Sequence, residues 1–324
     1  MNNGKSNILV CGSIVYDRIM NFPGKFSDHI LPDKVHILNV SFTLNRLSES
    51  FGGTGGNIAY NLALLGERPK LYGVVGADFE KYADWLKRNR VDIKNVKIAN
   101  EELTASAYIM TDRADNQIAG FYPGSKIQIP LTLPARASQW QAGPFVKGGT
   151  LAIVSPDLVA RMVEYAKIFK RFKIPYIFDP GQQITSFSPK ELNLAVKSAK
   201  VLIGNDYEIE LILKKLGLKR PVLAKIVETL VITKGDKGSE IYNQGKKLTI
   251  PAAKPKSVLD PTGAGDAYRA GFIKGLIMGW PLAKCGRLAA VTAVYTVEKY
   301  GTQTHRFSWQ ELIKRYRENY GERL

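Results

Sequence analysis

The sequence contains few cysteines and no long apolar segment. Cys11 and Cys285 are the only cysteines among 324 residues, so a disulfide framework is excluded and a reducing, cytoplasmic environment is expected. Residues 1–6 are polar and the apolar run at 8–10 is short, which predicts neither a secretion signal nor a membrane anchor. We therefore expect a soluble protein without a membrane partner.

Histidine is scarce, and positive charge is abundant but dispersed. His29, His36 and His305 are too scattered to predict a metal cluster, and we expect each to be a surface or packing residue. Lys and Arg number 46 against 29 Asp and Glu, a formal charge of +17, yet no block of five basic residues occurs. Such a charge favours a phosphate-bearing partner. A nucleotide is favoured over nucleic acid, although a basic RNA-binding protein stays an alternative that salt-dependent RNA binding would reveal.

Apolar runs and amphipathic segments alternate through the second half of the chain. The expected strands are 151–154, 176–178, 201–203 and 230–232, and the expected helices are 156–171, 189–197 and 207–216. This alternation predicts βαβ units, and hence a parallel sheet covered by helices on both faces. Ser155-Pro156 and Ser188-Pro189 place a capping side chain before a proline, and Asn205 can cap similarly, so helices are expected to begin there.

The first half has the same rhythm but is interrupted twice. Strands are expected at 8–12 and 71–75, and helices at 55–65 and 78–89. The stretches 35–42, 104–111 and 117–121 are rich in β-branched and aromatic residues and have no helix between them. We predict that they form a small antiparallel sheet that projects from the α/β body, with hinges at Gly52-Gly53 and 120–124.

The stretch Asp260-Pro-Thr-Gly-Ala-Gly-Asp266 carries the strongest chemical signal, because a helical pattern follows it directly. Peptide N–H groups of Gly263, Ala264 and Gly265 would lie at a helix N-terminus, where unpaired donors and the helix dipole favour an anion. Asp266 would stand beside that site as a base. The alternative is that Asp266 is only a helix cap.

A second glycine-rich stretch, Gly52-Gly-Thr-Gly-Gly-Asn57, also precedes an amphipathic helix. It lacks the Lys-Ser or Lys-Thr of a P-loop and does not fit the dinucleotide fingerprint. Its glycines let the backbone approach a ligand closely, and Asn57 offers a donor and an acceptor to sugar hydroxyls. Asp17, after the first strand, could accept two hydroxyl hydrogen bonds, or it is a solvated turn residue.

Together, the stretches 52–57, Asn205-Asp-Tyr-Glu208 and 260–266 resemble the ribokinase-like (PfkB) family of sugar and nucleoside kinases over nearly the whole chain. The resemblance implies a Rossmann-like three-layer α/β fold with a mainly parallel central sheet plus a small β-sheet lid. We expect one domain, 1–324, with lid segments at about 16–51 and 101–125 inserted in the body.

The resemblance also implies a site and cofactors. ATP would be the donor, with Asp266 as catalytic base and the peptides of 263–265 as the anion hole for the transferred phosphoryl group. Asn205 and Glu208 would help to place Mg²⁺ and phosphates, Glu208 through water. The other residues implied at the nucleotide are Thr233, Gly235 and Gly238. Arg269, one turn beyond Asp266, either contacts phosphate or forms a salt bridge on the helix surface, and Asp260 and Thr262 suggest K⁺ dependence.

Within this family the N-terminal half is similar to bacterial-type adenosine kinases, in the runs 12–17, 22–26, 40–42, 117–124 and 179–183. This implies that the ribose is held by Ser13, Asp17, Gly53 and Asn57. It also implies that Phe121 stacks on the base and that Ser41, Gln182 and Gln183 contact the nucleoside. Two departures concern the base pocket: Ala107, with Tyr108 beside it, stands where that group has a second aromatic, and Ser186 replaces an expected arginine.

We therefore predict an ATP-dependent kinase that transfers the γ-phosphate to the 5′-hydroxyl of a nucleoside, with adenosine as acceptor and AMP as product. Alternatives are another nucleoside or a sugar acceptor such as ribose, fructose or a sugar phosphate. A non-catalytic nucleoside-binding protein is a further alternative, which the absence of turnover would reveal. A homodimer formed through the lid sheet is also compatible with the resemblance.

Overall fold

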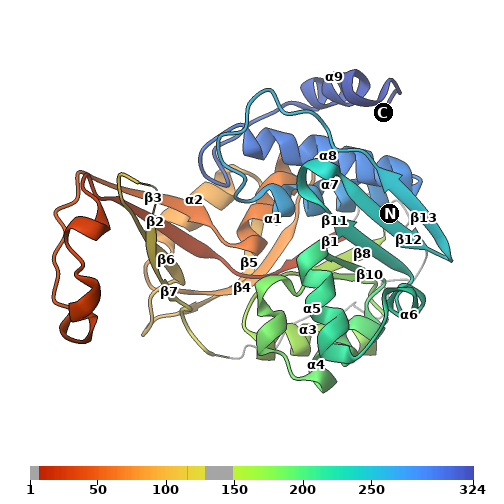
Figure 1. The fold of residues 1–324 in the computed structure, drawn as a ribbon. Helices are drawn as coiled ribbons and strands as arrows, with labels where there is room; N and C mark the ends of the chain where they lie inside the picture. Colours follow the sequence, from red (N-terminus) through yellow and green to blue (C-terminus); the bar gives the residue numbers. More distant parts are fainter. Residues whose placement is uncertain (1–6, 115, 128–148) are drawn as a thin grey trace.

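The computed structural model describes residues 7–114, 116–127 and 149–324. Its centre is a nine-stranded sheet with the order β13-β12-β11-β10-β9-β8-β1-β4-β5 (Figure 1). These strands are β1 (Asn7–Cys11), β4 (Lys70–Gly76), β5 (Asp92–Ala99), β8 (Thr150–Val154), β9 (Tyr176–Phe178), β10 (Val201–Asn205), β11 (Thr229–Thr233), β12 (Ser239–Asn243) and β13 (Lys246–Ile250). Neighbours from β11 to β5 are parallel, and β12 and β13 are antiparallel. The predicted α/β class is confirmed.

Helices cover both faces of this sheet, as the apolar strand runs predict. Along β1, Ile8 and Val10 face one core cluster, whereas Leu9 and Cys11 face the other. The first cluster is covered by α1 (Thr54–Leu64), α2 (Glu80–Arg88), α7 (Ala264–Ile277), α8 (Leu282–Val297) and α9 (Trp309–Tyr320). The second is covered by α3 (Val159–Arg171), α4 (Pro189–Ser198), α5 (Asp206–Leu216) and α6 (Arg220–Ile226). No helix in the described ranges is long and apolar enough to cross a membrane.

Two of the three predicted helix starts are confirmed. Ser188 and Asn205 are the N-caps of α4 and α5, each within a capping box. The prediction at Ser155 is wrong, because α3 begins only at Val159. The Ser155 hydroxyl instead donates to the carbonyl of Cys11 at 3.1 Å and so ties β8 to β1. A tertiary hydrogen bond therefore replaces the expected cap.

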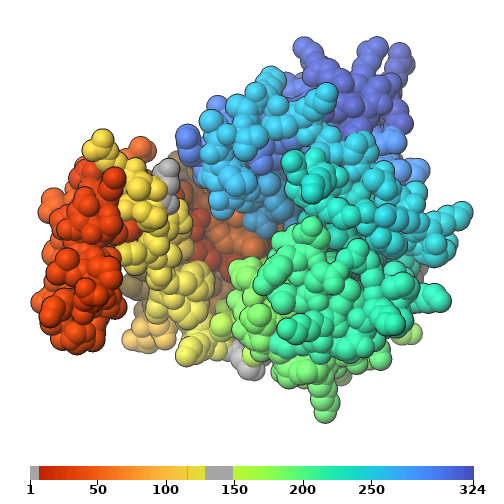
Figure 2. Space-filling model, in the orientation of Figure 1, coloured from red at the N-terminus to blue at the C-terminus, as the bar shows by residue number. Residues whose placement is uncertain are grey.

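A separate four-stranded sheet, here called the lid sheet, projects from the body and is well separated from α3–α5 (Figure 1). Its order is β3-β2-β6-β7, with β2 (Val15–Asn21), β3 (Arg46–Gly52), β6 (Ser106–Thr111) and β7 (Gln117–Tyr122). The space-filling view shows a hollow between these N-terminal segments and the body (Figure 2). The strands expected at 104–111 and 117–121 are thus present, and β2 pairs in parallel with β6 rather than antiparallel.

The strand expected at 35–42 is absent. A 3₁₀ helix, Pro32–Ile37, occupies its first part, and residues 38–45 have no regular structure. Phe42 packs instead on Phe22 and Phe26, with ring centroids 4.8 and 5.2 Å away. The partner of β2 is the polar segment Arg46–Gly52. Strand propensity at 35–42 therefore yields to an aromatic cluster and to the pairing available in the tertiary structure.

Candidate active site

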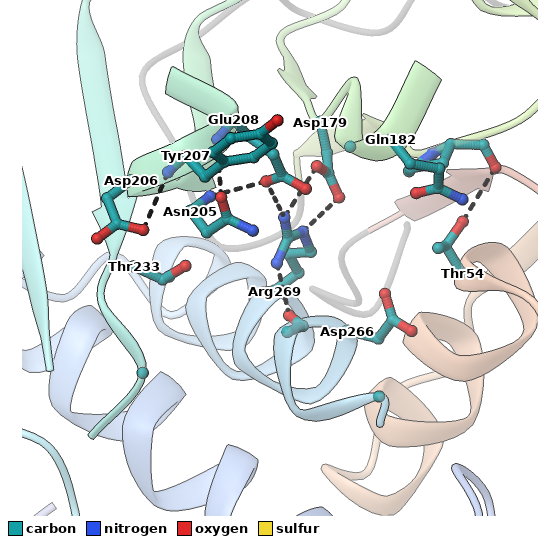
Figure 3. A pocket seen from close by; sticks show the side chains of 15 residues that line it. Thr54, Asp179, Gln182, Asn205, Asp206, Tyr207, Glu208, Thr233, Asp266 and Arg269 are labelled. Atoms are coloured by element: carbon teal, nitrogen blue, oxygen red, sulfur yellow. Dashed lines mark hydrogen bonds and ion pairs between the residues drawn. The ribbon is translucent and has the colours of Figure 1, made fainter. Parts of the chain in front are cut away.

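The candidate site lies where the parallel strands of the body end. A pocket of about 470 Å³ is lined by residues that follow β9, β10 and β11, and by the N-terminal ends of α1 and α7. The carboxyl edge of an open α/β sheet is the usual ligand site of such folds. Among the predicted residues, the pocket lining includes Gln182, Asn205, Glu208, Thr233, Gly235, Gly263, Gly265 and Asp266. Figure 3 shows the side chains around this pocket.

Asp266 lies in the first turn of α7 and is only 9% exposed. Its Oδ2 accepts a hydrogen bond from Nδ2 of Asn57 at 2.8 Å. Burial raises the pKa of Asp266 to about 7, and the carboxylates of Asp179 and Asp17 act in the same direction, against Arg269 and the Asn57 hydrogen bond. A carboxyl group with this pKa is divided between its two protonation states near neutral pH, as a general base requires.

The glycine turn before Asp266 has the geometry expected of an anion site. Gly263 is the N-cap of α7 at φ +79°, so the chain enters the helix through a conformation that favours glycine. Gly263 and Gly265 line the pocket at the positive end of the helix dipole. The N–H of Ala264 already donates to the carbonyl of Pro261 at 3.2 Å, so a phosphate oxygen would have to share that donor.

A buried ion pair closes the other side of the pocket. The guanidinium of Arg269 binds the carboxylate of Asp179 with two nitrogens, and its Nη1 donates to the carbonyl of Gly265 at 2.9 Å. Figure 3 shows Arg269 between Asp179 and Glu208, with Nη2 4.0 Å from Glu208 Oε2. The suggested salt bridge on the helix surface is therefore wrong, because Arg269 is buried and its partner lies 90 positions earlier. No local sequence pattern marked Asp179 for this role.

The segment Asn205–Glu208 forms a capping box at the start of α5. Asn205 Oδ1 accepts from the N–H of Glu208 at 2.8 Å, and Glu208 Oε2 accepts from the N–H of Asn205 at 2.7 Å. Burial, and secondarily Asp179, raises the pKa of Glu208. A nearby cation would favour its ionised form, and carboxylate oxygens suit Mg²⁺. The described residues contain no group of three His, Cys, Asp or Glu arranged to hold a metal.

Several predicted residues lie around the pocket rather than in its wall. Ser13 Oγ accepts from the N–H of Thr54 at 3.1 Å, and Thr54, which the sequence analysis did not single out, lines the pocket. Gly53 has φ +83°, and a Cβ there would lie 2.6 Å from the carbonyl oxygen of Ser13. Gly53 therefore lets the start of α1 approach Ser13 closely.

Three further predicted positions are not among the residues that line the pocket. Gln183 follows Gln182 in the 3₁₀ turn Gly181–Ser186. Gly238 does not line the pocket, and a Cβ there would lie 2.1 Å from the carbonyl oxygen of Ile250, so its visible function is to allow a tight turn. Ser41 is exposed in the irregular segment 38–45.

Asp260, expected beside a potassium ion, uses both carboxylate oxygens on the chain itself. They accept from the N–H groups of Thr262 at 2.9 Å and Gly301 at 3.0 Å. Despite some burial, these bonds hold the pKa of Asp260 below its ordinary value. These two hydrogen bonds therefore fix the loop before α7. Potassium dependence stays a prediction.

The lid sheet aligns three predicted positions in one row. Asp17 on β2 is opposite Ala107 on β6, and Ala107 is opposite Phe121 on β7, so their side chains share one face of the sheet. Burial raises the pKa of Asp17 to about 6, with Asp260 as the second cause. Asp17 also acts to raise the pKa of Asp266, so its carboxylate lies within electrostatic reach of the turn that carries Asp266. Tyr108 points to the other face, where its hydroxyl accepts from Arg18 at 2.8 Å.

Comparison with known proteins places this geometry in a family. The model of the pfkB family carbohydrate kinases matches residues 6–308. A nucleoside kinase of Methanothermobacter thermautotrophicus is 34% identical over 287 residues, which cover 87% of this chain and 90% of that protein. One of Methanocaldococcus jannaschii is 32% identical over 279 residues, covering 86% and 89%. The structure of Burkholderia thailandensis nucleoside kinase in complex with inosine has a TM-score of 0.82 at 33% identity, covering 98% of this chain and 100% of that one.

The matched region runs from β1 through α7 and so contains all the elements that build the pocket. It also contains all nine strands of the central sheet. The chain therefore belongs to the pfkB family of carbohydrate kinases, ATP-using phosphotransferases with an alcohol acceptor.

Proposed function

We propose that this protein transfers the γ-phosphate of ATP to the 5′-hydroxyl of a nucleoside. The observation that carries the proposal is the pairing of a buried carboxylate with an anion site at one helix N-terminus. The pKa of Asp266 is raised to about 7, and Gly263 and Gly265 line the same pocket. A base for the hydroxyl proton thus lies next to donors for the phosphoryl oxygens.

The chemistry asks little more of the protein. Phosphoryl transfer passes through a loose transition state, so catalysis consists mainly of alignment and charge stabilisation. Asp266 would accept the hydroxyl proton, and the start of α7 would receive the transferring group. A negative charge at that helix terminus is favoured by the dipole. Burial of Asp266 keeps the base out of bulk water and strengthens these interactions.

The residues on the β10 and β11 side of the pocket suit the donor. ATP would lie along the lining formed by Asn205, Thr233 and Gly235. Mg²⁺ neutralises phosphate charge when bound, and it dehydrates reluctantly, so it keeps water ligands. Glu208, whose Oε2 accepts from the N–H of Asn205, would reach it through water. The Arg269–Asp179 pair holds Arg269 in place beside the same side of the pocket.

The lid-sheet row suits a nucleoside better than a bare sugar. Asp17 and Phe121 are separated by one intervening strand, which corresponds to about 10 Å at the usual strand spacing. The Asp17 carboxylate accepts no hydrogen bond from the described residues and can receive ribose hydroxyls. Phe121 offers an aromatic face to a base, and the small Ala107 between them leaves room for the ligand. Three relatives named as nucleoside kinases support this class of acceptor.

Among nucleosides, we propose adenosine as the acceptor and AMP as the product. The support is the similarity of Phe121 and Gln182-Gln183 to the base pocket of adenosine kinases. The B. thailandensis protein was observed with inosine, which makes inosine the sharpest competitor. The two bases differ at the 6-position, amino against carbonyl. A single assay panel separates them.

A coupled assay of ADP release with MgATP tests the proposal, with adenosine, inosine, guanosine, cytidine, ribose, fructose and fructose 6-phosphate as acceptors and with and without K⁺. We expect turnover with nucleosides and the highest kcat/KM with adenosine. A higher kcat/KM with inosine would retain the nucleoside class and overturn adenosine. A sugar or sugar phosphate as best acceptor would overturn the nucleoside class. Binding without turnover on any acceptor would contradict a kinase.

A further inference from the structure

A chain of side-chain hydrogen bonds, buried at its inner end, lies behind the proposed base. Asn57 of α1 donates from Nδ2 to Asp266 Oδ2 at 2.8 Å, and Gln303 donates from Nε2 to Asn57 Oδ1 at 3.0 Å. Trp85 of α2 donates from its indole Nε1 to Gln303 Oε1 at 3.0 Å. These hydrogen bonds therefore connect three distant parts of the sequence to the carboxylate of Asp266.

The direction of these bonds is determined at one end by the indole. The N–H of Trp85 can only donate, so Gln303 must present its oxygen to it and its NH₂ group to Asn57. Asn57 must then present its oxygen to Gln303 and its NH₂ group to Asp266. A donor-only group thus orients two amides in series toward an acceptor-only carboxylate.

Water has little access to this chain. Gln303 is 3% exposed and Asn57 is 4% exposed, so a lost partner would not be replaced cheaply by solvent. Gln303 Nε2 also donates to the hydroxyl of Tyr82, which donates to the carbonyl of Gly52 at 2.8 Å. Both N–H groups of the Gln303 amide are therefore used, and its oxygen accepts from Trp85.

We propose that Gln303 is a positioning residue for phosphoryl transfer: it holds the amide nitrogen of Asn57 toward Asp266 and keeps the base ionised. This rests on the proposed role of Asp266 as the base. Gln303 is not among the residues that line the pocket, and its hydrogen bond goes to Asn57 instead of Asp266. It acts through the orientation of Asn57, and Trp85 acts one step further back.

Loss of Gln303 releases that orientation. Asn57 can then turn its carbonyl oxygen toward Asp266, which favours the protonated acid. The other groups that act on Asp266 are Arg269 on its own helix, Asp179 after β9 and Asp17 on β2, and the hydroxyl of Tyr82 on α2 is also near. Of these groups, the Tyr82 hydroxyl would also lose a hydrogen bond from Gln303, but it keeps its own bond to the carbonyl of Gly52, so the change at Asp266 should be carried mainly by Asn57.

The test is the pH dependence of kcat/KM for the nucleoside that the wild-type protein uses best. Gln303→Met keeps the length of the side chain and removes its hydrogen bonds. We expect the acid limb of the profile to move upward by about one pH unit. This is a tenfold loss on the acid side, where the ionised fraction limits the rate, with recovery toward wild type near pH 9. Gln310→Met, the same change at an exposed position of α9, should leave the profile in place.

A second variant keeps the test decisive if Gln303→Met does not fold. Trp85→Phe retains an aromatic ring and Gln303, but it removes the indole donor that fixes the oxygen of Gln303, while the Tyr82 hydroxyl still accepts from Gln303 Nε2. It should shift the acid limb the same way by a smaller amount. A loss of rate by one factor at every pH in the folded variants would show a structural role only and overturn the proposal. Retention of activity by Asp266→Asn would instead overturn the base assignment, which is a separate result.

Discussion

The body and the lid sheet hold their candidate site residues in opposite ways. In the body, Asp179 and Asp266 are buried and bonded to other side chains. On the lid sheet, the ring of Phe121 is 60% exposed and the carboxylate of Asp17 accepts no hydrogen bond from the described residues. The groups proposed for phosphoryl transfer are thus already positioned, whereas the groups proposed for the acceptor have unsatisfied surface. We infer that a bound nucleoside supplies the partners that the lid sheet lacks.

Removing the proposed base should give the largest effect. Asp266→Asn keeps the size of the side chain and loses its basicity, so we expect kcat to fall by about 10²–10⁴-fold, the usual contribution of a general base. Dissociation constants for ATP and adenosine should stay near the wild-type values. Calorimetry measures these dissociation constants, and steady-state kinetics measures kcat.

The same variant separates the two interpretations of Asp266. Asn and Asp are both strong N-cap residues, so a purely structural carboxylate would tolerate the change. Retention of more than about a tenth of the wild-type turnover would return Asp266 to a capping role.

Changing the lid sheet should have a smaller and more selective effect. Phe121→Ala removes an exposed ring whose proposed partner is the base, and stacking of a base on an aromatic contributes about 1–3 kcal/mol. We expect the adenosine kcat/KM to fall by about 5–150-fold, while the weak turnover of ribose is nearly unchanged. Ile118→Ala, an exposed residue on the same strand, serves as the control.

An unchanged adenosine kcat/KM in Phe121→Ala would contradict a base-stacking role. An equal loss with ribose would place the effect on the lid as a whole instead of on the base. Either result would reduce the contrast between the two regions.

The last expected effect concerns the pH dependence of stability rather than activity. The folded-state pKa of Asp266 is about 7 and that of Asp17 about 6, both above the unfolded value near 4. The folded state therefore binds more protons between about pH 4 and 7, so these two groups make the free energy of unfolding decrease as pH rises through that window. Asp266→Asn should remove the larger part of this decrease.

Thermal unfolding of wild type and Asp266→Asn at pH 4.5 and pH 8 measures this pH-dependent change in stability. We expect the variant to gain stability relative to wild type on going to pH 8. The difference is expected because the ionised buried carboxylate destabilises the folded body. A constant difference in Tm at both pH values would contradict the raised pKa.

Local chemistry was enough to predict much of the body. Ser188 and Asn205 cap helices as expected, because a cap depends on residues within three positions. The glycine turn at 263–265 leads into α7 for the same local reason. The prediction of a strand at 35–42 was wrong, because a β-strand must pair with another strand and residue propensity does not determine which segment pairs.

The sequence by itself determined the alternation of strands and helices, the helix caps at Ser188 and Asn205, and the glycine turn that carries Asp266. Only the tertiary structure decided that Arg269 pairs with Asp179, that β2 pairs with Arg46–Gly52, and that Trp85, Gln303 and Asn57 form one chain. The pKa of Asp266 belongs to the second group. A sequence contains the ionisable residues, but burial and the distances between charges, which set their pKa values, exist only after the chain has folded.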